Sequence, residues 1–99
     1  MYCVSFVGKN ENDAALCAKD FFENLKKLNE DAGEKLIILG PAAAKISKIN
    51  NQYRYKLLIK CKNSKKIRNL LMSVLNNIVK MKKYKEITVS IDLNPFDLN

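Results

Sequence analysis

The sequence predicts an α+β fold of two layers, in which two helices pack on one face of a four-stranded antiparallel sheet. The chain has 99 residues, enough for one domain with one hydrophobic core. Apolar residues make up 47% of it, so a core of ordinary size can form. Segments with the periodicity of strands and helices follow one another in the order β-α-β-β-α-β. We therefore expect residues 1–99 to form a single domain.

A strand and a long helix come first. Residues 2–7 alternate between two sides and end at Gly8, and one side carries Tyr2, Val4 and Phe6. Asn12 or Asp13 is expected to cap the next helix, because a short side-chain acceptor satisfies a free N–H of the first turn. Apolar residues then recur at helical spacing, at Ala14, Cys17, Phe21, Leu25 and Leu28. This stripe predicts a helix over about residues 13–29.

Two strands are expected in the middle of the chain. Residues 36–39 are apolar and precede the Gly40-Pro41 pair, which predicts a short buried strand that ends there, since Pro41 lacks the N–H that a ladder needs. Residues 53–62 show the clearest alternation. One side is apolar and expected in the core, with Tyr53, Tyr55, Leu57, Ile59 and Cys61. The other is cationic apart from Leu58, with Arg54, Lys56, Lys60 and Lys62.

A second helix and a last strand complete the fold. Ser64 is expected to cap a helix over about residues 65–80, whose apolar stripe is Ile67, Leu70, Leu71, Val74, Leu75 and Ile78. Alternation at residues 87–91 predicts a strand that stops before Pro95. Two split βαβ units of this kind define a ferredoxin-like sandwich. With the usual strand order of that fold, the open sheet face carries Ser5, Arg54, Lys56, Lys60, Thr88 and Ser90.

Positive charge is concentrated in the middle of the sequence. The formal net charge is +8, with 18 Lys and Arg against 10 Asp and Glu. Residues 45–85 contain 13 of the basic residues and no acid, whereas the segments on either side have a negative net charge. A basic run is often only a solvated face, but so long a segment without acids favours a polyanionic partner.

The composition gives little support for catalysis or for a metal site. The chain has no His, and its three cysteines are far apart and outside any CxxC pattern, as is typical of buried thiols in a reducing compartment. It has no glycine loop that could cradle a phosphate, and no Ser, Asp or Glu in a recognisable nucleophile or paired-carboxylate setting. We therefore expect no catalytic residue, metal or cofactor in this chain.

The ferredoxin-like fold also serves RNA-recognition motifs and small phosphatases, and the sequence argues against both. Tyr53 and Tyr55 share a side with Leu57, so no aromatic stacking platform is expected on the open face. A phosphatase of this fold needs an arginine directed into a loop after the first strand, but the first arginine is Arg54. An electrostatic surface remains, and its candidate phosphate contacts are Lys45, Lys48, Arg54, Lys56, Lys60 and Lys62.

Several motifs carry a resemblance to a known family. In order along the chain they are Ile38-Leu39-Gly40-Pro41-Ala42, Ile46-Ser47-Lys48-Ile49, Tyr53-Arg54-Tyr55-Lys56-Leu57-Leu58-Ile59-Lys60 and Val89-Ser90-Ile91-Asp92-Leu93-Asn94-Pro95. In this order and spacing they resemble the C-terminal domain of the bacterial replication-restart helicase family PriA, or primosomal protein N′. The motifs cover about residues 36–96, whereas residues 1–35 agree only in pattern. The residues taken as the family motif are Gly40, Pro41, Tyr53, Tyr55, Ser90, Asp92 and Pro95.

The resemblance implies an excised accessory domain of a cytoplasmic, nucleoid-associated bacterial helicase. In the family, two helicase lobes and a zinc region precede this domain, so ATP with magnesium, and zinc, belong to the full-length protein. The domain itself is expected to be a monomer that contacts those lobes and binds forks and single-stranded DNA. No stretch approaches the roughly 18 uninterrupted apolar residues of a membrane span, so no membrane contact is expected.

The resemblance also implies contact with the single-stranded-DNA-binding protein, whose acidic tail ends in a free carboxylate. The positive end of a helix dipole favours an anion, so the expected contacts are Ser64, Lys65, Lys66 and Arg68. Two alternatives to DNA binding stay open at this point. The basic surface could serve only as a protein-docking module, or the domain could bind RNA in the manner of a small ribosomal protein of similar shape.

Overall fold

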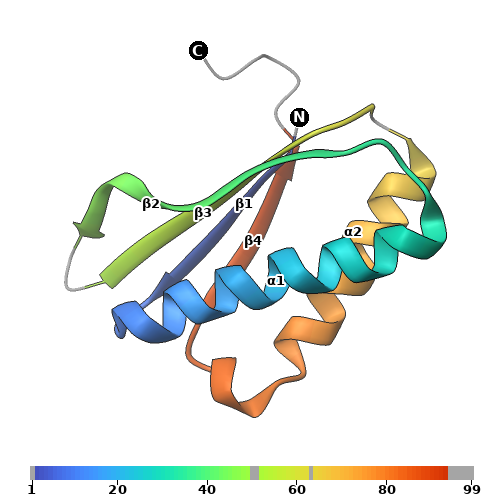
Figure 1. Ribbon diagram of the computed structural model, residues 1–99. Helices are drawn as coiled ribbons and strands as arrows, with labels where there is room; N and C mark the ends of the chain where they lie inside the picture. Colours follow the sequence, from blue (N-terminus) through green and yellow to red (C-terminus); the bar gives the residue numbers. More distant parts are fainter. Residues whose placement is uncertain (1, 50–51, 63, 94–99) are drawn as a thin grey trace.

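A computed structural model of the chain describes residues 2–49, 52–62 and 64–93, and for residues 42–49 it describes the backbone alone. Figure 1 shows two layers, with both long helices on the same face of one sheet. The elements in chain order are β1 (Tyr2–Gly8), α1 (Glu11–Ala32), β2 (Ile37–Ile49), β3 (Gln52–Lys60), α2 (Lys65–Val79), the 3₁₀ helix η1 (Lys82–Tyr84) and β4 (Thr88–Leu93).

The sheet has the strand order β2-β3-β1-β4, and each neighbouring pair is antiparallel. Strands β1 and β3 are therefore central, and β2 and β4 are the edges. The order β-α-β-β-α-β with this sheet confirms the ferredoxin-like α+β prediction. None of the described helices is long and apolar enough to cross a membrane.

The hydrophobic core lies between the sheet and the two helices. Side chains of β1 at Tyr2, Val4 and Phe6 are buried, and their counterparts on β3 are Leu57 and Ile59. The rings of Phe6 and Phe21 meet edge to face with centroids 5.5 Å apart, which joins β1 to α1. The apolar stripe of α2 is buried at Ile67, Leu70, Leu71, Val74 and Ile78. The predicted core side of both central strands is thereby confirmed, although on β3 Leu57 and Ile59 are buried and Tyr53 and Tyr55 are only half-buried.

Helix α1 begins earlier and ends later than predicted. Its N-cap is Asn10, whose side-chain oxygen accepts a hydrogen bond of 3.1 Å from the N–H of Asp13. The prediction of Asn12 or Asp13 as the cap was wrong, because Asn10 already has the extended backbone of a cap and Asp13 supplies the bonded N–H. The helix ends at Gly33, which adopts the left-handed conformation with φ 66°.

Strand β2 differs most from its prediction. It does not end at Gly40-Pro41 but continues through that pair to Ile49, with register shifts after Leu39 and after Ala43. The strand lies at the edge of the described sheet, beside β3, so the missing N–H of Pro41 can be accommodated at an irregularity. Nor is the strand buried throughout, because Ile37 is 60% exposed and Leu39 46% exposed.

The segment after α2 contains an element that the sequence pattern missed. The short helix η1 follows α2 directly and ends at Tyr84, whose side chain is buried. The predicted cap of α2 is confirmed, since Ser64 Oγ accepts a hydrogen bond of 3.2 Å from the N–H of Ile67. The last strand, β4, begins one residue after the start of the predicted alternation and ends at Leu93.

Candidate nucleic-acid interface

The face of the sheet opposite the helices is open. Because β1, β3 and β4 are paired in register, their outward residues form rows across the sheet. Ser5 pairs with Lys56 on one side and with Ser90 on the other. Val7 pairs in the same way with Arg54 and Thr88. The register thus brings together on one face all six side chains predicted for it: Ser5, Arg54, Lys56, Lys60, Thr88 and Ser90.

Strand β3 supplies the positive charge of this face. Lys56 and Lys60 are exposed and Arg54 is half-buried. Alternate residues of a strand lie about 7 Å apart, so Arg54 and Lys56 present two charges at a short, fixed spacing. Asp92, a residue of the family motif, is the acid of the described open face and belongs to the edge strand β4. Positive charge therefore prevails on the β3 side.

The other predicted phosphate contacts are placed differently. Lys62 follows the end of β3 and is exposed, beside the N-terminal end of α2. Lys45 and Lys48 belong to the backbone of β2, but their side chains lie outside the described part of the structure. Pro95 of the family motif also lies outside the described residues.

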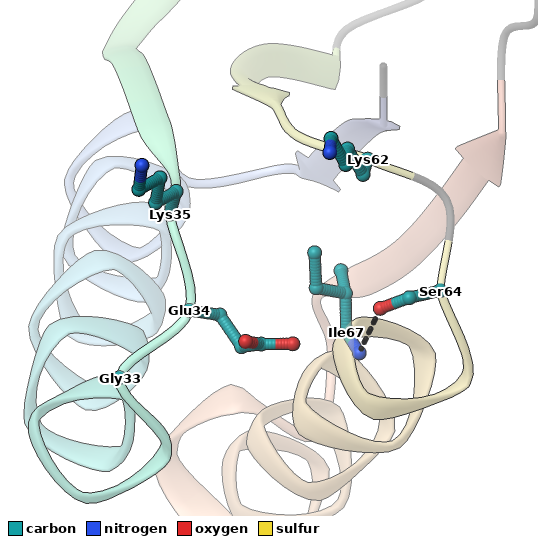
Figure 2. A pocket seen from close by; sticks show the side chains of 6 residues that line it. All are labelled: Gly33, Glu34, Lys35, Lys62, Ser64 and Ile67. Atoms are coloured by element: carbon teal, nitrogen blue, oxygen red, sulfur yellow. Dashed lines mark hydrogen bonds between the residues drawn. The ribbon is translucent and has the colours of Figure 1, made fainter.

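A pocket of about 410 Å³ lies at the N-terminal end of α2. Figure 2 shows its lining, where the side chain of Glu34 extends towards Ile67 and Ser64. Asn29 fixes the backbone of Glu34 from both sides. Its Nδ2 donates to the carbonyl of Glu34 at 2.8 Å, and its Oδ1 accepts from the N–H of Glu34 at 3.0 Å. The pocket is lined by Gly33, Glu34, Lys35, Lys62, Ser64 and Ile67.

The first turns of α2 beside this pocket are cationic. Lys65, Lys66 and Arg68 are exposed, and the first turn contains no acidic residue. Sequence reasoning found these residues and Ser64 but missed Lys35 and Glu34, which come from the loop after α1. No local pattern predicts that this loop meets α2, because the contact depends on the packing of the two helices.

Two ionisable groups in the interior, Cys17 and Tyr84, have raised pKa values. Burial, reinforced by the charge of Asp20, raises the pKa of the Cys17 thiol to about 12, so it stays protonated at neutral pH. Burial and a hydrogen bond to Asp20 likewise raise the pKa of Tyr84. Among residues 2–49, 52–62 and 64–93, no cluster of three His, Cys, Asp or Glu could hold a metal ion.

The remaining motif residues lie in the strands β2 and β3. Gly40 has φ 101°, a conformation that suits glycine, and its bond to Pro41 is cis. Tyr55 is half-buried against the core, on the helix side of β3. Tyr53 is half-buried opposite Gly8 in the same strand pair. The described part of the open face therefore has no aromatic ring, as the sequence predicted.

Fold and surface together define a small α+β domain with one sheet face open and cationic. A family model described as the primosomal protein N C-terminal domain, PriA_C, matches residues 1–96. The chain belongs to this family, which confirms the resemblance and extends it over residues 1–35.

The replication restart protein PriA of Bacillus subtilis (strain 168) is 30% identical over 95 residues, which are 96% of this chain and 12% of that protein. The chain thus spans about one eighth of the length of this curated relative.

Solved structures support the fold alone. The de novo designed protein Foldit4 has a TM-score of 0.60 at 16% identity, with 94% of each chain covered. A hydantoinase/carbamoylase family amidase from Burkholderia ambifaria has a TM-score of 0.57 at 8% identity, and the match covers 92% of this chain and 26% of the amidase.

Proposed function

We propose that this chain is a non-catalytic DNA-binding accessory domain of a replication-restart helicase. The observation that carries the proposal is the row of cations that β3 presents on the open face, Arg54, Lys56 and Lys60. Lysine and arginine side chains neutralise phosphates and release counterions without reading sequence. Membership of the PriA_C family supports DNA as the polyanion.

In this proposal the work of ATP hydrolysis belongs to helicase lobes outside these 99 residues. The domain would contribute contacts to branched or single-stranded DNA at a stalled fork and would pack against those lobes. It needs no cofactor for this role, whereas ATP with magnesium, and zinc, would serve the full-length protein. Lys45, Lys48 and Lys62 are the further candidates for phosphate contacts.

A salt titration with variants of the open face tests the proposal. Fork-DNA binding by the wild type is measured by fluorescence anisotropy at several salt concentrations, and Arg54→Glu with Lys60→Glu is measured in the same way. Each phosphate that the variant no longer neutralises should reduce the slope of log K against log salt by about 1. We expect the double variant to bind at least about tenfold more weakly, with little change in melting temperature. Unchanged affinity and slope would mean that the DNA site lies elsewhere on the domain. Stronger binding of structured RNA than of fork DNA would favour an RNA-binding function of the ribosomal type.

A second candidate function is the docking of the acidic tail of the single-stranded-DNA-binding protein. The pocket at the start of α2 supports it, because the helix end, Lys35 and Lys62 favour a carboxylate and Ile67 offers an apolar wall, against the like charge of Glu34 in the same lining. We expect a tail peptide to bind weakly and to shift the amide signals of residues 64–69. The triple variant Lys65→Glu, Lys66→Glu, Arg68→Glu should abolish those shifts, and equal affinity for wild type and triple variant would refute this docking.

A further inference from the structure

The open face is not only cationic, because a row of apolar side chains crosses it. Leu39 of β2 pairs with Leu58 of β3, and Leu58 pairs with Cys3 of β1. Ile37 lies next to this row and pairs with Lys60. Two of these residues are large hydrophobic groups that the fold leaves in solvent, since Ile37 is 60% exposed and Leu39 46% exposed. We call Ile37, Leu39 and Leu58 the aliphatic row.

Charges frame the aliphatic row on its β3 side. Lys60 lies two residues from Leu58 on the same face and Lys56 lies two residues in the other direction, so each is about 7 Å away along the strand. Asp92, the acid of the described open face, lies opposite Cys3 on the far edge strand. A ligand that fits the open face carries repeated negative charges and also exposes apolar surfaces, both at the spacing of these side chains.

Nucleic acid with unstacked bases has both properties, whereas a closed duplex does not. In a duplex the flat apolar faces of the bases are stacked on one another, so a protein surface meets phosphates and base edges. An unpaired strand or an opened junction exposes base faces beside phosphates. Leucine and isoleucine are among the side chains that proteins insert between base steps, where they contact the base faces that this unstacking exposes. The absence of aromatic rings from the described open face leaves this contact to aliphatic packing.

We propose that Ile37, Leu39 and Leu58 contact the faces of unpaired bases, and that this contact makes the open face prefer unpaired DNA to closed duplex DNA. The inference rests on the proposed DNA-binding function and deepens it. The lysines bind any DNA by its phosphates, and the aliphatic row adds the discrimination between unpaired and paired DNA.

The test compares two DNA probes of equal length at fixed salt, a single-stranded oligonucleotide of mixed sequence and the corresponding blunt duplex. The variant is Ile37→Ser with Leu39→Ser, at two positions that are already exposed. Leu16→Ser is the matched control, because Leu16 is 48% exposed but belongs to α1, on the opposite side of the sheet. Affinities and salt slopes come from fluorescence anisotropy, and melting temperatures show whether the fold persists.

We expect the double variant to bind the single strand about fivefold more weakly, which is the lower end of what a base stacked on an aromatic side chain contributes. Its affinity for the duplex should change less than about twofold, and its salt slopes should equal those of the wild type. The control Leu16→Ser should change neither the affinities nor the salt slopes. Equal decreases on both probes, or no decrease on the single strand, would overturn the inference. If the double variant has a lowered melting temperature, the single variant Ile37→Ser, at the more exposed of the two positions, is measured instead. A weaker affinity for the single strand alone then supports the inference, and equal decreases on both probes or no decrease overturn it. A wild type that binds neither probe would instead refute the proposed function itself.

Discussion

Tyr84 connects the short helix η1 to helix α1. Its ring is buried and its hydroxyl donates a hydrogen bond to Asp20 Oδ2. Lys83 Nζ lies 3.4 Å from the same carboxylate oxygen and 5.0 Å from the centre of the Tyr84 ring. Burial and the neighbouring Asp20 raise the pKa of the Tyr84 hydroxyl, so it remains a donor at neutral pH. The chain between α2 and β4 is thereby fixed to α1.

Tyr84→Phe should therefore destabilise the domain. The change keeps the ring but removes the hydroxyl that bonds Asp20, so we expect the free energy of unfolding to fall by about 1–2 kcal/mol. Denaturant unfolding measures this free energy for the wild type and the variant. Lys83→Met is the control, because an ion pair that involves an exposed lysine contributes little, and its effect should stay within about 0.5 kcal/mol. A larger decrease from Lys83→Met than from Tyr84→Phe would contradict these roles of the two residues.

Cys17 should make the domain less stable at alkaline pH. Its thiol is fully buried, and burial raises its pKa from the ordinary value of 9.0 to about 12 in the folded chain. Above about pH 9 the unfolded chain loses the thiol proton and the folded chain keeps it, so the unfolding free energy falls as pH rises. We expect a steeper fall between about pH 8.5 and 10 for the wild type than for Cys17→Ala, measured by denaturant unfolding at each pH. Equal slopes would mean that the thiol is accessible in the folded state.

At the scale of elements, the start of α1 shows what local sequence can and cannot decide. The apolar stripe identified the helix correctly, but five polar residues in a row, residues 9–13, offer more than one start. The choice depends on backbone conformation, and Asn10 is the residue with extended dihedrals and the bonded side chain. Pattern alone does not contain this information.

Asn10→Ala should cost stability and Asn12→Ala should not. Removing the cap leaves an N–H of the first turn unpaired, which costs about 1 kcal/mol. Asn12 lies inside the first turn and is exposed, so alanine there should be neutral or slightly stabilising. Thermal melts of the two variants give the comparison. A larger destabilisation by Asn12→Ala would restore the prediction made from sequence.

The edge strand β2 shows a different limit of prediction. A four-residue apolar run before Gly40-Pro41 is typical of a short buried strand, yet the structure extends the strand to Ile49 and leaves Ile37 in solvent. The strand has one partner, so its irregular register and its proline are tolerated. Edge position is a property of the whole sheet and could not be predicted from the run itself. The central strand β3 has neighbours on both sides and was predicted almost to its ends.

At the scale of the whole molecule, two candidate surfaces meet at one end. Lys60 belongs to the open face, and Lys62, two residues further, lines the pocket at the start of α2. A second pocket of about 600 Å³ lies between them, with a lining that includes Ile37, Lys60 and Lys62. Sequence alternation identified Lys60 and Lys62. Their proximity depends on how the loop after α1 packs beside the end of β3, which no sequence motif describes.

DNA on the open face and an acidic peptide in the α2 pocket should therefore weaken each other's binding. Both ligands are anions held near Lys60 and Lys62, so their repulsion raises the free energy of the doubly bound state. We expect saturating tail peptide to weaken fork-DNA binding about two- to fivefold at about 0.05 M salt, and the DNA to weaken the peptide by the same factor. The effect should vanish near about 0.5 M salt, where the screening length is only about 4 Å.

Fluorescence anisotropy of labelled fork DNA, with and without the peptide, measures this coupling. A peptide with its acidic residues replaced by the corresponding amides and its C-terminus amidated is the control, and it should leave DNA binding unchanged at every salt concentration. Coupling that persists at about 0.5 M salt would point to direct overlap of the two ligands, because screened charges no longer interact over that distance. No coupling at low salt would mean that the two anions bind too far apart for Lys60 and Lys62 to serve both, and at least one surface would have to be reassigned.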